Sequence, residues 1–239
     1  MKQPTRAVST AKKKQRKGRE NVFATRERAE AIAAILAERY PAAECALRYE
    51  GDAWRLLVMG RLSAQCTDAR VNEVSVPLFA RYPTPEAMAK ADPAELEAIV
   101  RPCGLFRTKA HDLIAASAML VNEYDGRLPD SMEELLRFPG VGRKIANLLL
   151  GDIYGQSCVV ADTHCIRLSG RFGFTPMDKR DPLLVERTLT PLLTGVNASD
   201  LCHRIVLFGR EVCTAHAPRC GECPIGARGL CRLKEMTDG

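Results

Sequence analysis

The chain has 239 residues, of which 46% are apolar, which is enough to bury a core and to form one large domain or two small ones. Aromatic residues make up 5%, Trp54 is the single tryptophan and alternating strand-like runs are scarce, so the composition favours helices and excludes a chain that is disordered throughout. The net charge is +6, and residues 1–25 account for it with eight Lys or Arg against one Glu, so any anionic ligand of the remaining residues must meet a local basic arrangement.

Residues 1–25 are predicted to form a disordered basic arm. Two interpretations of this arm stay open: a solvated tail that aids solubility, and weak, salt-sensitive attraction to nucleic acid phosphates. No apolar segment follows the basic start, and no run approaches the roughly 18 apolar residues of a membrane span. We therefore expect no secretory signal peptide, no membrane association and a cytoplasmic location.

Apolar residues at helical spacing predict a series of short helices joined by short loops. The first covers residues 26–40 and places Ala29, Ile32, Leu36 and Tyr40 on one face. Further helices are predicted at 54–63, 69–80, 93–100, 109–123, 133–137, 143–152, 163–171, 181–193 and 199–210. Ser131 with Glu134 is typical of a capping box, and Asp162 is the expected N-cap of the helix that follows it. The absence of a convincing βαβ unit predicts an all-α fold.

The segment FPGVGRK (138–144) places a glycine-rich turn between two of these helices. Backbone N–H groups of such a turn and of the next helix N-terminus converge on one point, which can bind a phosphate. Tight turns between helices also use glycine for positive φ without binding anything, so Gly140 and Gly142 leave both interpretations open. Arg143 and Lys144 follow directly and favour the phosphate site.

Four of the ten cysteines lie close together near the C-terminal end in the pattern C-x6-C-x2-C-x7-C. Cys213, Cys220, Cys223 and Cys231 indicate a metal site, because packing alone does not explain four reduced thiols in one short loop. The spacing does not separate tetrahedral zinc from a [4Fe-4S] cluster. The other six cysteines are scattered and are interpreted as small core residues.

Several of these segments resemble the endonuclease III family of helix-hairpin-helix DNA glycosylases. FPGVGRKIA resembles the family's hairpin with its catalytic lysine, VVADTHCIRLSGRFG its aspartate segment, and RLSAQCTDARVN and GLFRTKA two further segments. The cysteine pattern resembles the family's iron-sulfur loop, although its last spacing is usually five residues. Phe138, Ile145 and Ala161 stand where the family usually has Leu, Thr and Val.

The resemblance implies a two-lobed, all-α helix-hairpin-helix glycosylase fold with a C-terminal iron-sulfur cluster loop. A helical barrel lobe with the hairpin would cover residues 46–156, and an iron-sulfur lobe would combine residues 26–45 with 157–239. Duplex DNA carrying a damaged base or an abasic site would bind between the lobes of a monomer. We expect a cytoplasmic, nucleoid-associated protein with a [4Fe-4S] cluster as its cofactor, with zinc as the alternative.

By resemblance Lys144 is the nucleophile and Asp162 the catalytic carboxylate. A lysine nucleophile must be unprotonated, yet at the ordinary pKa of about 10.4 only ~0.04% of lysine side chains are free amine at pH 7. The adjacent Arg143, a helix N-terminus and partial burial would each favour the neutral amine. The alternatives are a surface lysine or phosphate contact for Lys144 and a simple N-cap for Asp162.

A glycosylase must flip its target base out of the duplex and fill the gap. By resemblance Gln65 enters the vacated space and Leu105 wedges into the stack, the alternatives being a loop glutamine that caps backbone groups and a turn anchor. Asp68 and His164 would lie at the lesion pocket, the alternatives being a helix cap and a capped core histidine. Gly140, Gly142, Arg143 and Arg219 would contact DNA phosphates.

The implied activity is that of a bifunctional DNA glycosylase and lyase, which excises oxidised pyrimidines such as thymine glycol and nicks the strand by β-elimination through a lysine imine. A monofunctional adenine-type glycosylase is the nearest alternative, and Lys144 together with the short chain argues against it. The remaining alternatives are a non-catalytic DNA-binding paralogue and a zinc-stabilised DNA-binding protein.

Overall fold

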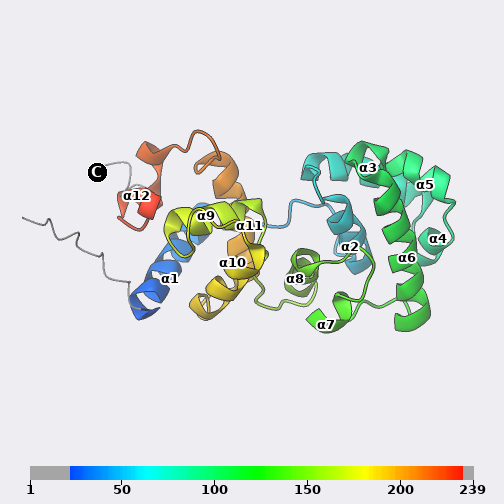
Figure 1. Cartoon of the computed structure of the whole chain (residues 1–239), viewed down its shortest axis with the longest axis horizontal. Coiled ribbons are helices and arrows are strands. Elements are labelled where there is room, and N and C mark those ends of the chain that lie inside the picture. Colours follow the sequence, from blue (N-terminus) through cyan, green and yellow to red (C-terminus); the bar gives the residue numbers. More distant parts are fainter. Residues whose placement is uncertain (1–21, 234–239) are drawn as a thin grey trace, which may run out of the picture.

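The computed structural model describes residues 22–233, and every regular element within this range is a helix (Figure 1). This confirms the predicted all-α fold class. The α-helices are α1 Val22–Arg39, α2 Ala53–Leu62, α3 Asp68–Arg81, α4 Pro85–Ala89, α5 Pro93–Val100, α6 Phe106–Tyr124, α7 Met132–Leu135, α8 Arg143–Asp152, α9 Thr163–Phe172, α10 Pro182–Leu189, α11 Ala198–Glu211 and α12 Pro224–Ala227. Three 3-10 turns are η1 Arg101–Cys103, η2 Thr190–Leu192 and η3 Cys220–Glu222.

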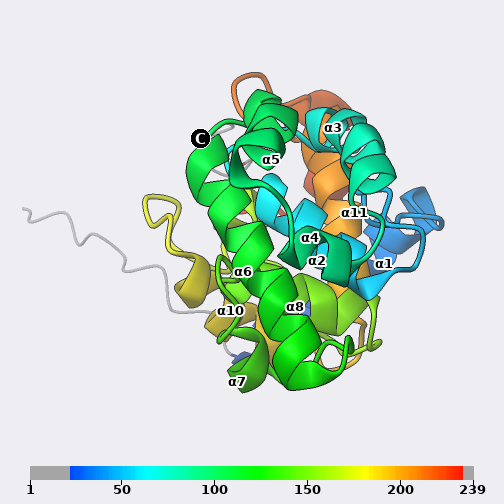
Figure 2. The same cartoon turned by 90° about the vertical axis from the view of Figure 1, so that its right-hand side faces the viewer.

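The helices form two groups with α8 beside the junction (Figure 1). One group contains α2 to α7, and Figure 2 views the molecule from this side, with α5 and α6 in front. The other contains α1 and α9 to α12, in which α11 packs on both α1 and α9. The chain therefore leaves the second group after α1 and returns to it before α9.

Most helices lie within three residues of their predicted ends, and the differences have local causes. The first helix begins at Val22, so the predicted arm is wrong for residues 22–25, where no Pro or Gly interrupts the helix; residues 1–21 lie outside the described part. The segment predicted as one helix at 181–193 tightens into η2 at Thr190. Helices α4 and α12 were not predicted, because five and four residues are too few to show a helical period.

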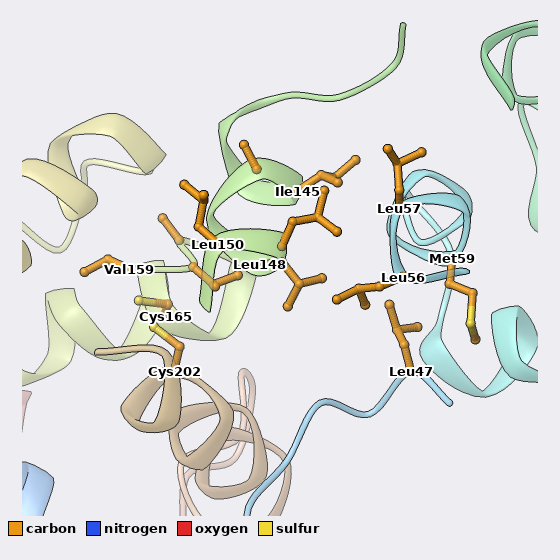
Figure 3. Close-up of a cluster of buried hydrophobic side chains, with 14 of the residues drawn as sticks. Leu47, Leu56, Leu57, Met59, Ile145, Leu148, Leu150, Val159, Cys165 and Cys202 are labelled. Atoms are coloured by element: carbon orange, nitrogen blue, oxygen red, sulfur yellow. The ribbon is translucent and has the colours of Figure 1, made fainter. Parts of the chain in front are cut away.

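Helix α8 is apolar on two sides and packs on both groups (Figure 3). Ile145 and Leu148 face Leu56 and Leu57 of α2, whereas Leu150 lies on the side of Val159, Cys165 and Cys202. This packing fixes the N-terminal end of α8, where Lys144 lies, relative to the elements of both groups.

Two glycines let α8 approach its neighbours closely. A Cβ added at Gly60 of α2 would lie 3.2 Å from Ile145 Cγ2, and one at Gly151 of α8 would lie 2.2 Å from Ser199 Oγ of α11. The second separation is too short for a Cβ at this position, so the Ser199 side chain of α11 packs directly on the Gly151 backbone of α8. None of the described helices has the length and apolar character needed to cross a membrane.

Candidate active site

A pocket between the two groups brings together three of the predicted site residues. Lys144 of α8, Asp162 at the start of α9 and Asp68 of α3 all line it. They come from three helices and are separated by up to 94 positions in the sequence, so only the fold places them side by side. The pocket thus combines the Lys144 amine with the carboxylates of Asp162 and Asp68, and Glu44 lines it as well.

Lys144 is the second residue of α8 and follows the glycine turn. Its side chain is exposed, so the predicted partial burial is wrong, although the residue does line the pocket. Gly142 is the N-cap of α8 and makes no side-chain cap hydrogen bond, which leaves the first-turn N–H groups open to an anionic ligand. The amine therefore lies at the positive end of a helix and is accessible from outside.

Asp162 caps α9 and lines the pocket at the same time. Its Oδ1 accepts a 2.7 Å hydrogen bond from the backbone N–H of Cys165, which confirms the predicted N-cap. This bond fixes the carboxylate at the pocket wall. The structural and functional interpretations of Asp162 are therefore compatible.

Asp68 is paired across the pocket. Its Oδ2 accepts a 2.6 Å hydrogen bond from Nη2 of Arg210 on α11, which joins the two helix groups. The N-cap of α3 is Thr67 and not Asp68, since the Thr67 hydroxyl accepts from the N–H of Arg70. The alternative interpretation of Asp68 as the helix cap is therefore wrong.

His164 is predicted to lie at the lesion pocket, but it is not among the residues that line this pocket. Its Nδ1 is 3.2 Å from Nη2 of Arg167. A Cβ at Gly209 would lie 2.5 Å from this Nδ1 of His164. Burial lowers the pKa of His164, against the opposing effect of the nearby Asp162 carboxylate. These contacts favour a half-buried core histidine.

Arg143, which precedes Lys144, forms an ion pair. Its guanidinium donates to both carboxylate oxygens of Glu186 on α10, with Nε to Oε2 at 3.0 Å, and this pairing raises the pKa of Arg143. Because Glu186 compensates its charge, Arg143 is an ion-paired residue next to Lys144. The pair also joins α8 to the group that contains α10, near the hairpin.

The residues predicted to enter the duplex lie on two loops with unusual backbone. Gln65 has φ 54° and Leu105 has φ 48°, and both are in the left-handed region that non-glycine residues rarely adopt. Both are exposed, with 55% of Leu105 accessible. An exposed leucine held in a strained turn is a poor anchor, which argues against that alternative.

Of the two glycines in the hairpin turn, Gly140 is closely packed and Gly142 has open space around it. Gly140 has φ 75°, and a Cβ there would lie 2.5 Å from Arg61 Nε and 2.8 Å from Asp112 Oδ2. Arg61 and Asp112 form a 2.7 Å ion pair beneath the turn. A Cβ at Gly142 would meet nothing within 4 Å, so this residue is free to face a ligand.

The cysteine loop carries donors that suit thiolates. Arg171 donates to Cys213 Sγ at 3.2 Å, and the Gly226 N–H donates to Cys223 Sγ at 3.3 Å. Burial raises the pKa of Cys213, and the nearby Cys231 and Cys223 raise it further. The donor set thus fits a thiolate-bound group, although residues 22–233 contain no three His, Cys, Asp or Glu side chains close enough to hold a metal ion.

Arg219 is held beside this loop by its own neighbours. Its guanidinium donates to the Glu211 carbonyl, with Nε at 3.1 Å, and its Nη1 lies 3.4 Å from Glu222 Oε2. Part of the side chain stays exposed, at 49%. Arg219 therefore has a structural role in addition to any contact with a phosphate.

Residues 58–193 match the family model for the HhH-GPD superfamily of base excision DNA repair proteins. The endonuclease III of a Synechocystis species is 43% identical over 201 residues, which cover 84% of this chain and 90% of that protein. The chain belongs to the endonuclease III family. It is a DNA glycosylase and lyase of base excision repair.

Further members of the endonuclease III family show the same relation. The Bacillus subtilis endonuclease III is 38% identical over 203 residues, covering 85% of this chain and 91% of that protein. A solved structure of a non-covalent endonuclease III–DNA complex is 37% identical and superposes with a TM-score of 0.82 over 89% of this chain and 98% of its own. The predicted family and fold are thereby confirmed.

Sequence reasoning missed the partners that hold the site. Arg210 pairs with Asp68 of the other helix group and Glu186 with Arg143 of α8, 142 and 43 positions away, and no local pattern reveals such pairs. Lys109, in the GLFRTKA segment, is fully buried. A signal for it existed, because Lys109 lies in helical register with the buried Leu113, Ala116 and Leu120.

Proposed function

We propose that this chain excises oxidised pyrimidines, such as thymine glycol, from duplex DNA and then nicks the strand by β-elimination. The family membership supports base excision, and the likeness to an endonuclease III bound to DNA supports duplex DNA as the partner. The observation that carries the proposal is the pocket that Lys144 and Asp162 share. A lysine at this pocket argues against an adenine-type monofunctional enzyme and against a non-catalytic paralogue.

Lys144 and Asp162 would divide the chemistry between them. The Lys144 amine attacks C1′ of the damaged nucleotide while the bond to the base breaks, and the Asp162 carboxylate stabilises the positive charge that develops at C1′. Loss of the ring oxygen bond gives an imine between Lys144 and C1′. Removal of a proton from C2′ then expels the 3′ phosphate and cuts the strand.

The surrounding residues would bind the DNA and the flipped base. Gln65 and Leu105 are proposed to fill the gap in the duplex, Asp68 to contact the lesion, and His164 to support the loop that carries Asp162. The phosphate contacts are assigned to Gly140, Gly142, Arg143 and Arg219. The open space at Gly142 and the uncapped N-terminus of α8 support this assignment.

We also propose that Cys213, Cys220, Cys223 and Cys231 hold a [4Fe-4S] cluster with a structural role. The N–H and guanidinium donors to Cys223 and Cys213 support a bound thiolate group. The proposed lobes are residues 46–156 and residues 26–45 with 157–239. The protein is proposed to be a monomer that acts on the nucleoid in the cytoplasm.

The function is tested by borohydride trapping of the purified protein on duplexes with thymine glycol, an abasic site or no lesion. Borohydride reduces an imine to a stable covalent adduct, so a lesion-dependent adduct is expected. Lys144→Gln is expected to abolish it while leaving duplex affinity nearly unchanged, since one phosphate contact contributes a small part of the total. Visible absorption near 400 nm and iron analysis separate the cluster from zinc.

The trapping experiment distinguishes lyase chemistry, base specificity and simple DNA binding. An adduct with the abasic site alone would confirm the lyase chemistry and contradict the proposed base specificity. The absence of an adduct with both lesions would contradict the lysine mechanism. A loss of duplex binding in Lys144→Gln would show instead that Lys144 is a phosphate anchor.

A further inference from the structure

Lys109 of α6 is fully buried, with none of its surface accessible, although a lysine side chain is charged at neutral pH. Its Nζ donates three hydrogen bonds of 2.8 Å, to the backbone carbonyls of Leu62, Ala64 and Cys103. An ammonium group has three donors, so all of them are used. Burial lowers the pKa of Lys109 from its ordinary value.

No carboxylate between residues 22 and 233 pairs with this ammonium, so carbonyl dipoles alone compensate its charge. A buried charge without a counterion is costly, and an apolar side chain of similar length would fill the same space at lower cost. Filling the core therefore does not explain a lysine at this position. A group that can join three carbonyls does.

The three carbonyls belong to the two loops that present Gln65 and Leu105. Leu62 ends α2 and Ala64 directly precedes Gln65, whereas Cys103 lies two residues before Leu105. The Lys109 ammonium thus joins two loops to each other. Leu62 and Ala64 of the first loop precede Lys109 by 47 and 45 residues, and Cys103 of the second precedes it by 6. Its position fixes the separation of the two loops.

We propose that Lys109 is a positioning residue that holds Gln65 and Leu105 in register for entry into the duplex when the damaged nucleotide is flipped. This inference rests on the proposed function. Lys109 itself is buried and contacts no DNA, so it acts only through the two loops. The left-handed backbone at both inserted residues is maintained by the same carbonyl contacts on the chain beside them.

The test compares Lys109→Met with the matched control Leu113→Ala, which removes buried side-chain volume from the same helix one turn further along. Single-turnover borohydride trapping is measured on an abasic site in a duplex and on the same site in a single strand, where there is no stacked gap to fill. For Lys109→Met we expect the duplex rate to fall about 100-fold, because small misplacements have effects of this size. The single-strand rate should stay within about twofold of wild type.

Thermal unfolding of both variants shows whether each is folded, and Lys109→Gln provides a second variant that keeps two amide donors. Lys109→Gln is expected to recover part of the duplex rate. Should Lys109→Met fail to fold, the duplex to single-strand ratio of Lys109→Gln, relative to wild type, decides the question in its place.

Two results would overturn the inference while the proposed function stands: equal losses on duplex and single strand in Lys109→Met, or the same selective loss in Leu113→Ala. A wild-type protein that forms no adduct with either substrate would contradict the proposed function itself and the inference with it. The two failures are therefore distinguishable in one experiment.

Discussion

At the residue scale, the Asp162 carboxylate accepts a hydrogen bond from a backbone N–H of its own helix and lines the same pocket as Lys144. The N-terminus of α9 stabilises a negative charge on Asp162, because the N–H groups of the first turn favour an anion there. Capping needs an acceptor oxygen, whereas stabilising positive charge at C1′ needs the full negative charge. Replacing one carboxylate oxygen by an amide NH2 keeps the acceptor oxygen and removes the negative charge, so it separates the two requirements.

Asp162→Asn keeps an N-cap of nearly equal strength and removes the charge. We expect base release from a thymine glycol duplex to slow about 100-fold or more, with a smaller effect on cutting of a preformed abasic site. Asp181→Asn is the matched control, since Asp181 caps α10 away from the pocket. Equal losses in the two variants, with lowered melting temperatures, would show that Asp162 acts only as a cap.

Two of the scattered cysteines show the effect of burial on a thiol. Burial raises the pKa of Cys45 to about 12 and that of Cys103 to about 11, with the adjacent Cys66 contributing to the second shift. At pH 8 a thiol with a pKa near 12 is only ~0.01% thiolate, the form that alkylating reagents attack. In the native protein we expect iodoacetamide to label both residues far more slowly than after denaturation, as measured by peptide mass spectrometry. Rapid native labelling of either would show that its loop opens readily.

At the element scale, the hairpin uses its two glycines for different purposes. Gly140 combines positive φ with the close approach of the Arg61–Asp112 ion pair, so it is required by the fold. Gly142 has φ −100° and open surroundings, so the fold accepts a side chain there. A phosphate that approaches the N-terminus of α8 would not tolerate one.

Gly140→Ala is therefore expected to destabilise the protein by about 2 kcal/mol or more, through left-handed backbone and overpacking together. Gly142→Ala should change stability by roughly 0.5 kcal/mol and weaken duplex binding. Thermal or urea unfolding and a binding titration at fixed salt measure both effects. Unchanged duplex affinity in Gly142→Ala would contradict the proposed phosphate contact.

Sequence reasoning succeeded at this scale wherever a helix carried its own signals. The helix at 93–100 was placed correctly at both ends because Asp92 caps it and proline occupies its first position. The N-cap half of the predicted capping box is confirmed, since the Ser131 hydroxyl accepts from the Glu134 N–H. Helix α4 has a cap and a proline of the same kind at Thr84 and Pro85, but its five residues show no period.

The site was predictable to the extent that each residue lies in a segment typical of the family. Lys144, Asp162 and Asp68 do line one pocket, as the resemblance implies. The pairing of Asp68 with Arg210 and the burial of Lys109 depend on contacts between distant segments, which a single sequence does not encode locally. The exposure of Lys144 differs from the prediction for the same reason.

At the scale of the whole molecule, α8 determines how the two helix groups meet. It packs on α2 and α7 of one group and on α11 of the other, and its Arg143 pairs with Glu186 of α10. The close packing of the Ser199 side chain on Gly151 sets the distance between α8 and α11. The pocket walls come from both groups, so this distance also sets the width of the active site.

Gly151→Ala places a Cβ where Ser199 Oγ lies, and the two helices must move apart. We expect a loss of stability of about 1–3 kcal/mol and a fall in the rate of base excision at saturating substrate. Gly221→Ala, where a Cβ meets nothing within 4 Å, is the control. Normal excision by a destabilised Gly151→Ala variant would show that the spacing of the groups is not critical for catalysis.

The return of the chain to its first helix group imposes an order on biosynthesis. Helix α1 contacts α11, η2 and α12, which a ribosome makes after more than half of the chain has followed α1 out. At a synthesis rate of about 5–20 residues per second the interval between α1 and α12 is roughly 10–40 s, during which Ala29, Ile32 and Leu36 have none of these partners. The intervening helices α2 to α7 are complete earlier, so nascent chains are expected to acquire their native order from the middle outward.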